Sequence, residues 1–201
     1  MTDESHLISR AQQGDAAALA EIVENHQRTV YNVALRMCGN AHDAEETLQE
    51  TFLSAIKALP KFEGRSQLST WLYRIASNTC LMQRRRAANA PDSTPLDNGD
   101  DDEFEEPRYF VDWSYQPDDV LLDKELREVM EKAIVALPDT QRLVFIWREL
   151  EGLSTAETAE VLGISEGTVK VRLHRARMKL RELLSAGYLD NAMEVEADGR
   201  P

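Results

Sequence analysis

Cysteine is scarce in this 201-residue chain, which contains only Cys38 and Cys80. Two cysteines do not make a disulfide framework in a chain of this length, so we expect a reducing, cytoplasmic location. Long hydrophobic runs are missing as well. No stretch reaches the roughly 18 apolar residues of a membrane-spanning helix, and the acidic first ten residues lack the apolar segment of a secretory signal. We therefore expect no membrane insertion.

Groups that could perform chemistry are equally sparse. The sequence holds no nucleophile with an evident base, no phosphate-binding glycine loop and no paired carboxylates suited to a cleft. Cys38 and His42 have a spacing that two zinc ligands can adopt, but His26 and Cys80 would have to converge on the same point. Buried structural cysteines are the simpler interpretation. We expect a protein that is not an enzyme and that holds no metal or other cofactor.

Positive charge is in deficit, with 23 Lys and Arg against 36 Asp and Glu and a formal net charge of −13. The distribution of charge is uneven. Residues 163–184 hold six bases and two acids, and residues 54–86 hold seven bases and one acid. Between these segments, residues 92–119 hold eleven acids and one base. Two basic segments separated by an acidic one favour two surfaces for a polyanion.

Helical periodicity dominates the chain and strand signals are almost absent, which predicts an all-α protein. Periodicity is lost in a segment rich in Pro, Asp, Asn and Gly, which predicts a flexible acidic linker interrupted by an aromatic cluster at 109–115. We expect two small helical domains joined by this linker. The predicted boundaries are a first domain at 1–88, the linker at 89–117, a second domain at 118–186 and a disordered acidic tail at 187–201.

The second domain ends in the pattern of a helix-turn-helix motif. Ser154 and Glu157 have the spacing of a capping box at the start of one helix. Gly163 interrupts that helix, and Ser165 is a good N-cap for the next. In such motifs the second helix enters the major groove of duplex DNA. At about 100° per residue, the buried stripe of that helix consists of Val169, Leu173, Ala176 and Leu180.

The opposite face of this second helix can approach DNA. Gly167 permits close approach of the backbone, and Ser165 and Thr168 lie where helix N-terminal groups meet phosphate. Arg175 is the best candidate for a bidentate contact with guanine. A basic face that is merely solvated is the alternative. The residues expected to contact duplex DNA are Ser165, Gly167, Thr168, Lys170, Val171, Arg172, His174 and Arg175.

Two segments of the first domain also have the pattern of binding surfaces. The helix expected from Asp43 to Leu59 carries Leu53 beside acids on its outer face, which suits a protein partner with a basic rim. Acids that simply suit the helix dipole are the alternative. The segment that follows interleaves bases with aromatic residues, as in proteins that bind single-stranded nucleic acid. The spacing of Trp71 and Ile75 indicates that Trp71 is at least partly core.

Both domains contain stretches that resemble one family, the bacterial RNA polymerase sigma factors of the extracytoplasmic-function (ECF) group of the sigma-70 family. The stretches "DAEETLQETFLSAIKALPKFEG" and "STWLYRIASNTC" resemble sigma region 2. The stretch "LPDTQRLVFIWRELEGLSTAETAEVLGISEGTVKVRLHRARMKL" resembles region 4. The resemblance implies a transcription initiation factor that binds core RNA polymerase and promoter DNA and is often held by an anti-sigma factor. Region 4 would read the minus-35 element as duplex, and region 2 would help to melt the minus-10 element.

The resemblance also implies roles for residues of the first domain. Core polymerase would bind the acidic helix at Asp43, Glu46, Gln49, Glu50 and Leu53. The minus-10 element, with one base flipped out, would be held by Phe62, Gly64, Arg65, Ser66, Ser69, Thr70, Tyr73, Arg74 and Asn78. Val171 departs from the family pattern, in which a small polar residue is frequent. The alternative function is a stand-alone helix-turn-helix transcriptional regulator, which would bind duplex DNA tightly without polymerase.

Overall fold

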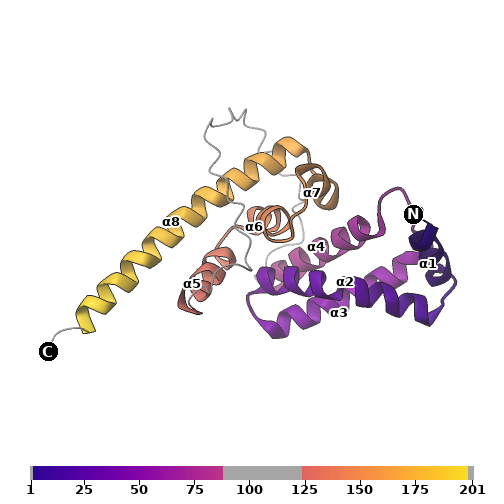
Figure 1. Cartoon of the computed structure of the whole chain (residues 1–201), viewed down its shortest axis with the longest axis horizontal. Coiled ribbons are helices and arrows are strands. Elements are labelled where there is room, and N and C mark those ends of the chain that lie inside the picture. Colours follow the sequence, from indigo (N-terminus) through magenta and orange to yellow (C-terminus); the bar gives the residue numbers. More distant parts are fainter. Residues whose placement is uncertain (1, 88–123, 199–201) are drawn as a thin grey trace.

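The computed structural model describes residues 2–87 and 124–198, and within these ranges it contains helices and no strands, as predicted (Figure 1). The predicted linker and its aromatic cluster lie outside these ranges. The first domain consists of α1 (Thr2–Gln12), α2 (Ala16–Cys38), α3 (Ala41–Ala58), the 3-10 helix η1 (Leu59–Lys61) and α4 (Leu68–Ala87). The second consists of α5 (Lys124–Val135), α6 (Asp139–Phe145), the π-helical turn η2 (Ile146–Leu150), α7 (Thr155–Leu162) and α8 (Glu166–Asp198).

Helix ends in the first domain follow local side-chain chemistry. The Asp15 carboxylate accepts hydrogen bonds from the backbone amides of Ala17 and Ala18 and so caps α2. The Arg10 side chain bonds the same carboxylate and lowers the pKa of Asp15. At the other end of α2, Gly39 adopts a left-handed φ of 79°, which glycine accommodates without strain. Both ends of this helix are therefore fixed by residues next to them in the sequence.

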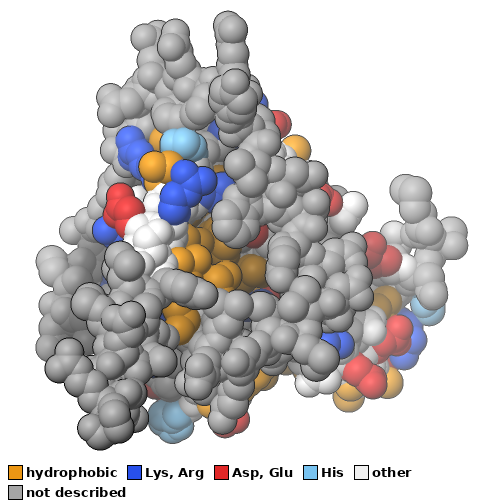
Figure 2. All heavy atoms as spheres, turned by 60° about the vertical axis from the view of Figure 1, so that its left-hand side comes forward, with side chains coloured by type: hydrophobic (Ala, Val, Ile, Leu, Met, Phe, Trp, Pro, Cys, Tyr) orange, Lys and Arg blue, Asp and Glu red, His pale blue; other side chains and the backbone are white. Residues whose placement is uncertain are grey.

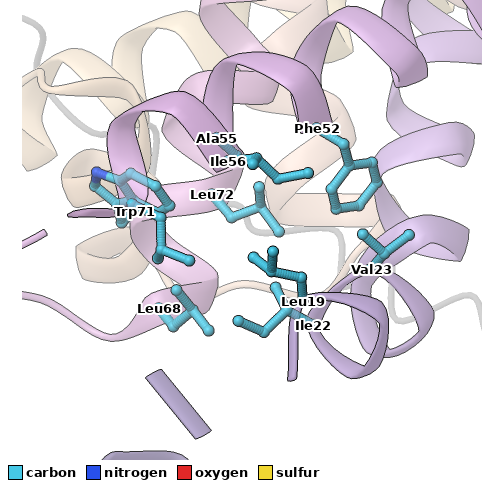
Figure 3. A pocket seen from close by; sticks show the side chains of 10 residues that line it. Leu19, Ile22, Val23, Phe52, Ala55, Ile56, Leu68, Trp71 and Leu72 are labelled. Carbon is cyan, nitrogen blue, oxygen red and sulfur yellow. The ribbon is translucent and has the colours of Figure 1, made fainter. Parts of the chain in front are cut away.

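The core of the first domain lies between α2, α3 and α4. Val30, Phe52 and Leu72 pack there, and Trp71 is partly buried, as predicted. A small apolar pocket remains between these helices (Figure 3). Its cavity volume of about 10 Å³ holds one water molecule at most. Ile56 lies at this pocket and is 40% exposed, because the apolar face of α3 is not fully covered at that end.

In the second domain, α8 packs on α6 and α7, and the predicted stripe is confirmed: Val169, Leu173, Ala176 and Leu180 are all buried. The helix then continues to Asp198, past α5 and away from both domains (Figure 1). This differs from the disordered tail predicted at 187–201. Adding a residue to an existing helix costs far less than nucleating one, and this segment contains no proline before Pro201.

The two domains pack against each other and share one hydrophobic core. The cluster joins side chains of α2, α3 and α4 to those of the second domain, among them Val33, Met37, Cys80, Leu81, Leu143, Ile146 and Trp147. Figure 1 shows α6 lying alongside α2 and α4. The sequence predicted two separate domains on a tether, and helical periodicity carried no signal for this contact.

Arg142 of α6 is buried at the domain boundary, with 1% of its surface exposed. Its guanidinium donates to the carbonyl oxygen of Met37 on α2 at 2.7 Å, and to those of Val135 and Leu137 at the end of α5. These carbonyls lie at helix ends, where no intrahelical donor is available. Burial lowers the pKa of Arg142 to about 10, so the side chain remains charged at neutral pH.

Two ion pairs add charge complementarity across the boundary. Arg36 of α2 contacts Glu151 at 2.7 Å, and Arg84 of α4 contacts Asp139 at 3.1 Å. The Glu151 side chain is 13% exposed. Burial raises the pKa of Glu151, and the neighbouring Arg36 opposes that shift. The first of these pairs is therefore partly desolvated, and its loss should weaken the contact between the domains.

Exchange of charge between Arg36 and Glu151 tests the packing of the domains. Arg36→Glu brings two carboxylates together at a partly buried site, which costs several kcal/mol in comparable interfaces, so we expect the domains to separate. Small-angle X-ray scattering of the full chain should then show a larger radius of gyration. Adding Glu151→Arg restores opposite charges and should restore the smaller radius. Lys57→Glu, the same charge change on α3, is the control. An unchanged radius in Arg36→Glu would contradict the packing.

Candidate nucleic-acid interface

The helix-turn-helix is formed by α7, Gly163 and the start of α8. The capping box is present in full: Glu157 donates its backbone amide to the Ser154 hydroxyl, and the Glu157 carboxylate accepts from the Ser154 amide. Hydrogen bonding by the side chain and backbone of Ser154 lowers the pKa of the Glu157 carboxyl group. Gly163 ends α7 at a left-handed φ of 67°. The sequence predicted each of these features.

The N-terminus of α8 is capped by Ser165. Its hydroxyl accepts a hydrogen bond from the Thr168 amide at 3.0 Å and also bonds the Thr168 hydroxyl at 2.8 Å. The first turn of α8 therefore presents backbone amides and two hydroxyl groups at the positive end of the helix dipole. Such an end suits a phosphate group of the DNA backbone.

The predicted duplex-binding residues differ in how far they reach solvent. Ser165, Gly167 and Lys170 are exposed, and a second group is half-buried: Thr168, Val171, His174 and Arg175. Figure 2 shows basic side chains gathered with a histidine on one face of the molecule. Arg172 is only 4% exposed, which differs from the prediction. It follows Val169 by three residues and precedes Ala176 by four, so it lies on the buried side of α8.

The predicted base-holding loop connects η1 to α4. Its centre projects into solvent: Glu63, Gly64 and Arg65 are exposed, and no atom lies within 4 Å of a Cβ built on Gly64. Phe62 packs its ring on Trp71, with 5.0 Å between the ring centroids, and Ser66 is half-buried. The loop thus combines an exposed centre, which a nucleotide can reach, with a first residue that is fixed by aromatic packing.

The remaining minus-10 candidates lie on α4. Asn78 is exposed and Ser69 half-buried. Thr70 is 8% exposed, so little of its side chain reaches solvent in this arrangement. Tyr73 is half-buried because its ring stacks on Trp147 of the second domain, with 4.9 Å between centroids and 26° between planes. Its hydroxyl also lies 3.4 Å from His26 Nδ1, and burial raises the pKa of Tyr73.

Arg74 makes a direct contact with the helix-turn-helix. Its guanidinium donates to the carbonyl oxygen of Glu160 at 2.5 Å. Glu160 belongs to the last turn of α7, where carbonyl groups lack intrahelical donors and the helix dipole is negative. The Arg74 cation supplies a hydrogen-bond donor to such a carbonyl group and places positive charge at the negative end of the helix dipole. In this arrangement the predicted minus-10 surface is therefore partly covered by the predicted minus-35 domain.

Trp147 in the π-helical turn completes this contact. Its indole is fully buried, and Nε1 donates to the Ser77 hydroxyl of α4 at 3.0 Å. The partners are separated by 70 residues in the sequence. Sequence reasoning missed Trp147, Ser77 and Arg142 as joining residues. The available signal was the apolar run "LVFIW", which predicts burial but not the partner.

The predicted polymerase-binding residues lie along α3. Asp43, Glu46 and Gln49 are exposed, and Leu53 is 58% exposed, an unusual position for a leucine. The Asn40 side-chain amide donates to Asp43 at 2.8 Å. Glu50 accepts hydrogen bonds from Gln83 and Arg86 of α4. The structure therefore brings four of the five onto an open surface and ties the fifth to the neighbouring helix.

Other classes of site find little support in the part of the chain that the structure describes. In residues 2–87 and 124–198 no three His, Cys, Asp or Glu side chains gather to hold a metal ion. Within the same ranges no helix is long and apolar enough to cross a membrane. Cys38 and Cys80 are free thiols whose pKa values burial raises, and Cys80 is fully buried.

Comparison with known proteins gives relatives over nearly the whole chain. It is 34% identical to the ECF RNA polymerase sigma factor SigW of Bacillus subtilis, over 88% of this chain and 94% of that protein. It is 34% identical to the ECF RNA polymerase sigma-E factor of Escherichia coli, over 85% of this chain and 88% of the relative.

Solved structures give the same picture. CnrH, in complex with the cytosolic domain of CnrY, has a TM-score of 0.64 and 26% identity over 91% of this chain and 97% of that one. RpoE of Bartonella quintana, in complex with the anti-sigma factor NepR, has a TM-score of 0.58 and 24% identity over 83% of this chain and 96% of that one. This likeness supports the fold alone. Family models for sigma-70 region 2 and region 4 match residues 22–90 and 127–180. The chain belongs to the extracytoplasmic-function group of the sigma-70 family.

Proposed function

We propose that this transcription initiation factor uses three surfaces for three partners: the outer face of α3 for core RNA polymerase, the loop at 62–67 with the start of α4 for the minus-10 element, and the start of α8 for the minus-35 element. It performs no chemistry of its own and acts in the cytoplasm. The observation that carries the proposal is the capped, exposed start of α8 in the same chain as the projecting loop.

The polymerase surface rests on the combination of an exposed leucine with acids. Leu53 is 58% exposed beside a helix face that carries Glu46 and Glu50. An apolar anchor with an acidic surround suits a groove with a basic rim, where the charges speed encounter and the apolar contact slows release. We also propose that an anti-sigma factor withholds the chain from polymerase by covering the same surfaces, as the family resemblance implies.

Promoter binding requires the two domains to separate. The names of the two elements place them about 25 base pairs apart, which is roughly 85 Å of B-DNA at 3.4 Å per base pair. In the packed arrangement Arg74 touches Glu160, so the two DNA surfaces lie side by side. The 36 residues at 88–123 reach roughly 120 Å when fully extended, which is enough to cover the distance. We therefore propose that the packed form does not bind a promoter and that polymerase binding holds the domains apart.

Run-off transcription tests the function directly. Mapping of transcript start sites after overproduction supplies a candidate promoter, and the purified chain is then added to core polymerase. We expect initiation at that promoter only when the chain is present, together with weak binding of the free chain to duplex DNA. Tight duplex binding without polymerase, and no initiation with it, would instead support the stand-alone regulator.

Leu53→Asp tests the polymerase surface. Replacing the exposed apolar anchor with a carboxylate should abolish co-purification with core polymerase, because the charge would have to be buried in the contact. Since Leu53 is exposed, the melting temperature should change little. Met178→Asp is the matched control, because it makes the same change at another exposed apolar residue, on α8. Normal co-purification of Leu53→Asp would refute this surface.

Arg175→Ala tests readout of the minus-35 element. If the guanidinium contacts a guanine, the change should cost about 1–3 kcal/mol of promoter binding and relax the preference at one base pair. Binding of the reconstituted holoenzyme to a set of single-base variants of the element measures both effects. Lys179→Ala removes an exposed cation paired with Glu182 on the same helix and serves as the control. An equal loss on every variant would make Arg175 a phosphate contact.

A further inference from the structure

The side chain of Gln12 reaches from the end of α1 to the start of the base-holding loop. Its Nε2 donates to the carbonyl oxygen of Leu59 at 3.1 Å and to that of Phe62 at 2.8 Å. Gln12 lies outside the segment at 22–90 that the region 2 model matches. No role was predicted for it from the sequence, because its two partners are 47 and 50 residues away.

These two carbonyls are the points at which the chain leaves η1. Phe62 has an extended backbone, with ψ of 117°, and its amide donates to the Leu59 carbonyl at 3.0 Å. A carbonyl oxygen has two lone pairs, so Leu59 accepts Gln12 in addition to the Phe62 amide, and a single side-chain amide has two N–H groups to offer. Gln12 therefore sets the direction in which the backbone turns from η1 into the loop.

Apolar packing fixes the same region to α1. Ala11, next to Gln12, is 4% exposed and lies in one cluster with Leu59 before the loop and Leu68 after it. Phe62 and Trp71 pack against this cluster. Both ends of the loop thus rest against one apolar cluster built from α1 and α2, while its centre at 63–65 is exposed. The two hydrogen bonds from Gln12 supply the directional part of this support.

We propose that Gln12 is a positioning residue for the capture of the minus-10 base. The inference rests on the proposed function, since it assigns Gln12 to the loop that would hold that base. Extrusion of a base costs unstacking and unpairing energy, which a preformed pocket offsets. A loop that must first be ordered offsets less of that cost. Gln12 would therefore affect the opening of the promoter, while the binding of polymerase would not depend on it.

Gln12→Met isolates the hydrogen bonds, because methionine has a similar length and helix propensity and lacks N–H donors. Gln13→Met makes the same change at the next residue, whose side chain is exposed, and is the matched control. The variants are assembled with core polymerase and compared on two templates. One is the fully paired promoter, and the other carries the same promoter with its minus-10 segment already unpaired. The readout is the ratio of transcripts from the two templates.

For Gln12→Met we expect a roughly tenfold lower ratio than for the wild type, in line with the loss of two hydrogen bonds. Polymerase affinity should be unchanged. Gln12→Lys, which again offers N–H donors, should recover most of the ratio, and its added charge acts on both templates alike. Gln13→Met should match the wild type.

Three results would overturn the positioning role. They are an unchanged ratio in Gln12→Met, an equal loss of transcription on both templates, and a failure of Gln12→Lys to recover the ratio. A variant that is simply less stable would also give the second result, an equal loss on both templates. A wild-type chain that supports no transcription from either template would instead refute the proposed function, so the two failures are distinguishable.

Discussion

The position of one indole ring determines how the two domains of this chain lie relative to each other. Trp147 stacks on Tyr73 and donates to Ser77, both on α4, while its own backbone belongs to the π-helical turn of the second domain. With the ring in this place, the end of α7 comes within hydrogen-bonding distance of Arg74. The shared hydrophobic core then closes around the contact.

In this arrangement the two predicted DNA surfaces partly cover each other. The groups that join the domains include Tyr73 and Arg74, which the minus-10 element would also require. Aromatic stacking and a cation at a helix end are interactions that unpaired DNA bases and phosphates can replace in kind. Separation of the domains therefore exchanges contacts between the domains for similar contacts with DNA. The free energy for this separation would come from binding to polymerase.

The features that the sequence predicted well are those with short-range causes. The caps at Ser154 and Ser165 and the buried stripe of α8 depend on residues within one or two turns. The burial of Arg172 and Thr70 was missed, because the edges of a buried stripe depend on what packs beside the helix.

The contacts between domains, and the reach of Gln12 to Phe62, join residues too far apart in sequence for periodicity to report. The resemblance to a family supplied the identity of the surfaces, and it gave no information on how these surfaces meet in the free chain. Local patterns thus predicted the candidate minus-35 surface and the resemblance predicted the minus-10 surface, whereas the contact between these surfaces became visible only in the structure.

The distance between the domains tests the central claim most directly. Spin labels at Glu24 on α2 and Glu182 on α8, both exposed, report it by pulsed electron paramagnetic resonance. The account predicts one narrow distance distribution in the free chain and a mean distance longer by tens of ångströms in the complex with core polymerase and promoter DNA. The same distribution in a transcriptionally active complex would contradict it.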